Sequence, residues 1–177
     1  AEPAVFALMD YWTFDGWFAL KRRLAQNGAP KLLKRVFPGI ELRLMAPMAG
    51  RLNAHVLFSD DIADQMLHDF KAALHVELIN RPLSNDSLIA LARAVGEDKL
   101  KLHGIKKADV DSHAQVALLA GAVIAEINCD SYKTAIEKVP NAKAVGFMPF
   151  DTSDGLAEVK WQEHYAYCLG LFKSSPI

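Results

Sequence analysis

The two cysteines are the residues whose chemistry the sequence constrains most. Cys129 and Cys168 are the only cysteines among 177 residues, and each falls within or at the end of a stretch with helical periodicity. The chain begins at Ala1-Glu2-Pro3 without an initiator methionine, as exported proteins do after removal of a signal peptide. Two cysteines in an oxidising compartment usually pair. The sequence therefore predicts a periplasmic or secreted protein with a structural disulfide between Cys129 and Cys168.

A nucleophilic cysteine is the alternative, with His113 or His164 as the base beside Cys129. No local signature marks such a pair. Glu126 is a further candidate for acid-base chemistry, because it interrupts the apolar sequence 123–127 and a buried carboxylate needs a partner. If Glu126, His113 and His164 met in a cleft between helices, they would form the catalytic site of a small enzyme.

Aromatic side chains with polar tips suggest a ligand site near the C-terminus. Trp161 and Tyr165 lie beside Cys168 in a helical stretch. Indole and phenol rings offer both a flat apolar wall and a hydrogen-bonding group, which is the usual lining of a ligand pocket. The sequence predicts ligand contacts from these two side chains.

A second aromatic cluster lies near the N-terminus. Trp12, Phe14, Trp17 and Phe18 fall within seven residues and therefore on more than one side of the element that carries them. Because a single core lies on one side, at least one of these rings is expected to be exposed. We predict that Trp12 and Trp17 are ligand-binding residues, on a surface for a protein partner or for self-association into a homo-oligomer.

Histidine and carboxylate residues between positions 60 and 75 do not predict a metal site. Asp64, His68 and His75 recur along one polar face, but that pattern is typical of a solvated helix surface, and a divalent cation would need further ligands. The Gly-x-Ser-x-Gly, Walker, Gly-x-Gly-x-x-Gly and His-Glu-x-x-His motifs are absent. We expect no metal and no cofactor.

The overall composition is that of a globular protein, with 51% hydrophobic residues and a net charge of −1. This balance gives no reason to expect nucleic acid as a partner. The longest apolar run, residues 116–125, is too short to span a membrane. Charge is uneven, because residues 1–53 carry eight Lys or Arg against four acids. Solvated surface explains that excess, and a basic partner-binding face is the alternative. The residues of this face are Lys21, Arg22, Arg23, Lys31, Lys34 and Arg35.

Hydrophobic periodicity predicts a mainly helical α+β fold in one domain over residues 1–177. Predicted helices cover about residues 15–25, 30–37, 59–74, 86–96, 108–128, 132–139 and 154–173. The Ala- and Gly-rich stretch 108–128 is expected to be the hub of a helical bundle, because small side chains let helices approach closely. Alternating residues predict a small antiparallel β-hairpin over 40–58.

A thioredoxin-like β-α-β unit over residues 5–45, followed by a helical insertion, is the alternative architecture. It lacks supporting chemistry, since no Cys-x-x-Cys follows the first strand. Taken together, these patterns favour an exported, soluble, non-enzymatic protein that binds a protein partner or a small apolar ligand. A small enzyme with His and carboxylate acid-base chemistry is the alternative function.

Overall fold

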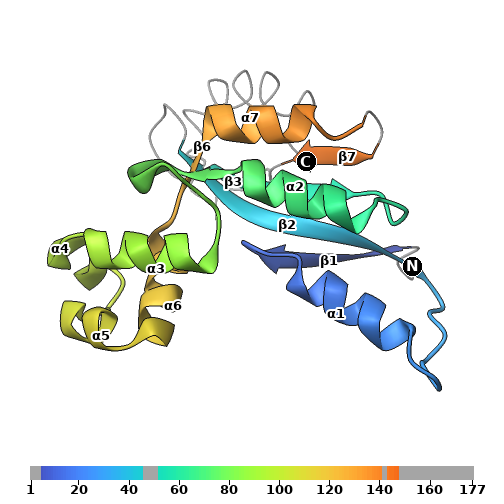
Figure 1. Cartoon of the computed structure of the whole chain (residues 1–177), viewed down its shortest axis with the longest axis horizontal. Coiled ribbons are helices and arrows are strands. Elements are labelled where there is room, and N and C mark those ends of the chain that lie inside the picture. Colours follow the sequence, from blue (N-terminus) through green and yellow to red (C-terminus); the bar gives the residue numbers. More distant parts are fainter. Residues whose placement is uncertain (1–4, 46–51, 141–142, 148–177) are drawn as a thin grey trace, which may run out of the picture.

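A mixed, seven-stranded β-sheet organises the protein. The computed structural model describes residues 5–45, 52–140 and 143–147. Figure 1 shows the sheet with α1, α2 and α7 arranged around it, and with α3, α4, α5 and α6 grouped at one end. In chain order the elements are β1 (Val5–Tyr11), α1 (Asp15–Leu24), β2 (Arg35–Met45), β3 (Leu52–Phe58), α2 (Asp64–Ala73), β4 (His75–Val76), the 3-10 helix η1 (Glu77–Ile79), β5 (Arg81–Pro82), α3 (Asn85–Ala94), α4 (Glu97–Lys101), α5 (Lys107–Ser112), α6 (Ala114–Ile124), β6 (Ile127–Asn128), α7 (Cys129–Glu137) and β7 (Ala144–Phe147).

The first three elements form a parallel β-α-β unit. β1 pairs with β2 in a register that runs from Val5 opposite Arg35 to Tyr11 opposite Glu41. The carboxylate of Asp10 accepts a hydrogen bond from the Gly16 backbone N–H at 2.6 Å, which ties the start of α1 to the end of β1. The β-α-β unit of the alternative architecture is therefore present over residues 5–45, whereas its thioredoxin-like character stays a prediction.

The predicted hairpin is confirmed. β2 and β3 pair in antiparallel fashion, with Gly39 opposite Leu57 and Leu44 opposite Leu52. Buried and half-buried residues alternate strictly along β3, as expected for a strand with one face in the core. The predicted turn at residues 47–50 lies outside the described residues.

The prediction of a mainly helical bundle is wrong, because the protein is mixed α/β. The strand order is β5-β4-β6-β2-β3-β7, with β1 also paired to β2. Three of these strands, β4, β5 and β6, have only two residues each, and β7 has four. Such short segments show no period, so the stretch after Ser59 looks helical in sequence although it contributes four strands to the sheet.

Two predicted helices also differ from the structure. The predicted helix 30–37 does not form, because Arg35, Val36 and Phe37 pair with β1 at the start of β2. The predicted helix 108–128 is divided at His113, whose extended backbone separates α5 from α6. The expected close packing is nevertheless present. A Cβ atom added to Gly121 of α6 would lie 2.1 Å from the backbone oxygen of Leu88 in α3.

The N-terminal aromatic residues belong to the core, so the prediction that one of them is exposed is wrong. Trp12, Phe14 and Trp17 are 3%, 1% and 7% exposed, and Phe18 is half-buried. Phe14 packs edge-on against Phe58 of β3, with 5.4 Å between ring centroids. The rings are covered by the sheet on one side and by helices on another. A single core can therefore bury side chains that point in different directions from the backbone.

Candidate functional site

The structure places two of the three predicted catalytic residues, His113 and Glu126, and they lie apart. His113 precedes α6 and Glu126 follows it, so the 11 residues of that helix separate them. At a rise of 1.5 Å per residue, this separation is about 16 Å. His113 is exposed, and Glu126 is half-buried in the connection to β6. His164 lies outside the described residues.

The predicted ligand-binding tryptophans of the N-terminal region are structural. Trp12 has a positive φ of 66° at the end of β1, and its indole N–H donates to the carbonyl of Ala122 at 2.9 Å. This bond ties the end of β1 to α6. Trp17 is buried in the same core. Trp161 and Tyr165 lie outside the described residues.

Cys129 is the first residue of α7. Its Sγ atom donates a hydrogen bond to the backbone carbonyl of Met45, the last residue of β2, at 3.0 Å. Cys168 lies outside the described residues, so the disulfide stays a prediction.

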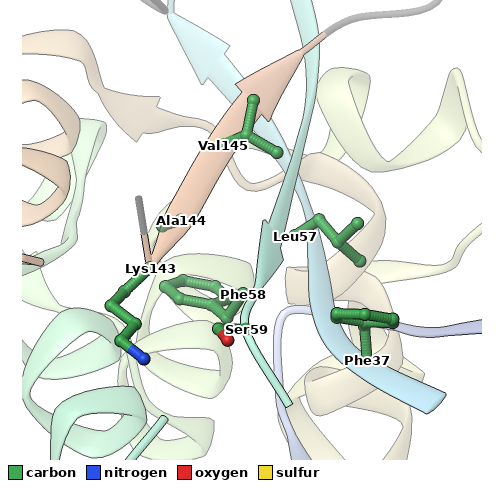
Figure 2. Close-up of a pocket in the computed structure, with 7 residues that line it drawn as sticks. All are labelled: Phe37, Leu57, Phe58, Ser59, Lys143, Ala144 and Val145. Atoms are coloured by element: carbon green, nitrogen blue, oxygen red, sulfur yellow. The ribbon is translucent and has the colours of Figure 1, made fainter. Parts of the chain in front are cut away.

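An apolar pocket lies where β2 and β7 begin and β3 ends (Figure 2). Its volume is about 260 Å³. The strand register explains this lining. Leu57 of β3 lies directly opposite Gly39 of β2 on one side and Val145 of β7 on the other. Phe37 lies two residues before Gly39 in β2. Side chains two residues apart or directly opposite share a face of a sheet. The lining residues are Phe37, Leu57, Phe58, Ser59, Lys143, Ala144 and Val145.

Charged groups lie beside this pocket in pairs. Lys143 contacts the carboxylate of Asp61 at 2.5 Å, and the hydroxyl of Ser59 donates to the same carboxylate. The lysine bond, followed by the serine bond, lowers the pKa of Asp61 below its usual value. The ammonium group is thus already paired, so the pocket suits an uncharged ligand better than an anion.

A second pair joins β2 to the segment after β3. Arg35 makes a two-pronged contact with Asp60, at 2.8 Å from Nε and 2.5 Å from Nη2. Hydrogen bonding from this guanidinium lowers the pKa of Asp60 and raises that of Arg35. The guanidinium also lies 5.0 Å from the centre of the Phe37 ring, so it braces one wall of the pocket.

A row of polar and aromatic side chains continues from the pocket across the same sheet face. The register places Tyr11 opposite Glu41, Glu41 opposite His55, and His55 opposite Phe147. The Nε2 atom of His55 lies 3.7 Å from the Glu41 carboxylate, and its ring stacks on Phe147 with centroids 5.4 Å apart. Arg43 lies over the Tyr11 ring at 5.4 Å. These contacts join neighbouring side chains of the row in pairs. The polar groups do not converge on a single point where a substrate could react.

Sequence reasoning missed this pocket. The alternation over residues 40–58 assigns Leu57 to the polar face of the hairpin, together with Glu41 and His55. A leucine on a polar face was the signal that something apolar lies there. The structure identifies this apolar neighbour as Val145 of β7, a strand that periodicity did not predict.

Within the described residues, no cluster of three or more His, Cys, Asp or Glu side chains is arranged to hold a metal ion. No helix in the described part of the chain combines the length and apolar character needed to cross a bilayer. Comparison with known protein families finds no family that matches the sequence, and comparison with curated proteins finds no significant relative.

Proposed function

We propose that this is an exported, non-enzymatic binding protein that holds a small, uncharged, apolar ligand in the pocket between the ends of β2, β3 and β7. The observation that carries the proposal is the lining of a pocket of about 260 Å³, in which Phe37, Leu57 and Val145 supply apolar walls. Pockets that bind small molecules combine mainly apolar walls with a few polar groups. The volume suits a ligand smaller than a typical drug.

The polar groups of the pocket favour binding over chemistry. The lining includes a hydroxyl from Ser59 and an amine from Lys143, and both contact the carboxylate of Asp61. The lowered pKa of Asp61 makes its carboxylate a weak base for taking a proton from the hydroxyl. The separation of His113 and Glu126 at opposite ends of α6 also favours binding over acid-base chemistry that uses these two side chains.

Titration with an uncharged fluorescent apolar probe, N-phenyl-1-naphthylamine, tests the proposal. We expect saturable binding at one site per chain. Leu57→Lys should weaken that binding at least tenfold, which is about 1.4 kcal/mol, because a charge would enter the apolar wall. Val145→Lys is a second variant at a position already 45% exposed, where the fold should tolerate the change.

Leu119→Lys is the matched control. Leu119 is 59% exposed and lies on α6, outside the pocket lining. It should bind the probe like the unmodified protein. Equal affinity in all four proteins, or binding without saturation, would refute the proposed site. Displacement of the bound probe by an added protein partner would instead identify the pocket as a protein-docking site.

A further inference from the structure

Four exposed apolar side chains gather at one end of the sheet. Val5 and Phe6 of β1 are 50% and 49% exposed, and Leu32 and Leu33, just before β2, are 42% and 90% exposed. Val5 pairs with Arg35 across the strands, so the start of β1 and the connection from α1 to β2 lie side by side. Figure 1 shows this connection at the far end of the molecule from α4 and α5. We call this region the apolar end.

Basic residues are frequent in the part of the chain that forms the apolar end. Residues 16–40 contain six Lys or Arg and no Asp or Glu. Lys21 pairs with Asp64 at 2.6 Å, and Arg35 pairs with Asp60. Arg22, Arg23 and Lys31 are exposed and belong to none of the ion pairs found in the described part of the chain. Arg23 bonds instead to the neutral side-chain oxygen of Gln26 at 3.1 Å. This end therefore combines exposed apolar groups with three positive charges that no ion pair among the described residues neutralises.

We propose that the apolar end docks on an anionic phospholipid surface. Leu32, Leu33 and Phe6 would enter the boundary between headgroups and acyl chains, while Arg22, Arg23 and Lys31 contact headgroup phosphates. Charge complementarity supports this occupant, because anionic lipids attract clusters of basic residues. The mode is attachment to the surface, in which apolar side chains insert only a few ångströms.

The shape of the region favours lipid over an acidic protein. Leu32 and Leu33 lie in a connection without helix or strand, and Leu33 is 90% exposed. Such protruding side chains would need a matching cavity on a protein partner. A lipid interface accepts them without one, because it adapts to whatever enters it.

Vesicle cosedimentation with the full chain tests the proposal. The probes are vesicles of phosphatidylcholine alone and of phosphatidylcholine mixed with phosphatidylglycerol. We expect binding to the mixed vesicles only, weakening as salt is added because salt screens exposed charges. The double variant Leu32→Ser with Leu33→Ser should weaken binding at least about tenfold, since apolar burial drives insertion. The double variant Arg22→Gln with Arg23→Gln should weaken it by about fivefold for each charge removed.

The matched control is Leu102→Ser with Lys99→Gln. Leu102 is 83% exposed next to α4, so this control removes an apolar side chain and a charge from a distant surface. It should sediment like the unmodified protein. The proposal is overturned if mixed vesicles do not bind, or if the leucine variant binds as well as the control. Salt-sensitive binding to polyglutamate without vesicle binding would identify an acidic protein as the partner instead.

Discussion

The contact between α3 and α6 and the pocket at the end of the sheet are both apolar, yet one is closed and the other is open. At the helix contact, Gly121 leaves no room for even a Cβ atom against the backbone of Leu88. At the sheet end, Phe37, Leu57 and Val145 leave a pocket of about 260 Å³. Apolar composition therefore does not decide whether a region is core or site. The geometry of the backbones decides it. Two helices can pack closely at a glycine, whereas the edge of the sheet where β2 and β7 begin and β3 ends leaves space between the side chains.

The largest expected effect is the loss of stability when the predicted disulfide between Cys129 and Cys168 is removed. Cys129 contacts the end of β2, where a disulfide to Cys168 would act as a covalent tie. A bridge over a loop of this length contributes about 4 kcal/mol in the chain-entropy model. Reduction, or Cys129→Ser, should lower the free energy of unfolding in urea by about that amount. Two free thiols titrated in the denatured, unreduced protein would contradict the disulfide.

The next effect tests the closed helix contact. Gly121→Leu should lower the free energy of unfolding by about 3 kcal/mol, because the new side chain meets the backbone of Leu88 rather than a flexible group. Leu119→Ala is the control on the exposed side of the same helix and should change stability by about 0.5 kcal/mol or less. Thermal unfolding measures both. An unchanged melting temperature for Gly121→Leu would mean that the two helices do not pack closely.

The matching substitution in the open region should be far milder. Val145→Phe adds bulk to the pocket lining at a position that is 45% exposed, and it should change the free energy of unfolding by about 0.5 kcal/mol or less. It should at the same time reduce binding of the apolar probe, because it fills the site. If Val145→Phe destabilises the protein as much as Gly121→Leu, the contrast between a closed and an open region is wrong.

The smallest effect is on the pH dependence of stability. The lowered pKa values of Asp60 and Asp61 mean that the folded protein favours their charged forms. Their contribution is present above the ordinary aspartate pKa of about 4 and is lost as the pH falls through the lowered values. Both groups are at the surface, so the effect is modest. Urea unfolding from neutral to acidic pH should be less pH-dependent in Asp60→Asn and Asp61→Asn than in the unmodified protein. Equal slopes would show that these pairs do not contribute.

Several elements followed from local sequence alone. The alternation of residues 40–58 predicted the pairing of β2 with β3, and the helical period after Asp15 predicted α1. The small residues around Gly121 predicted a close helix contact. These features depend on neighbouring residues, whose side-chain period and size carry the information. They could be derived without knowing what the chain folds against.

Tertiary structure decided the sheet and the candidate site. β6 and β7 are too short to show a period, and they exist because β2 and β3 offer them hydrogen-bonding edges. The same long-range pairing buried Trp12 and Trp17, separated His113 from Glu126, and set Val145 beside Leu57. The sequence by itself determined which segments favour helix or strand. Only the folded chain determined which apolar side chains close against each other and which are left lining a pocket, because that depends on contacts between residues far apart in the chain.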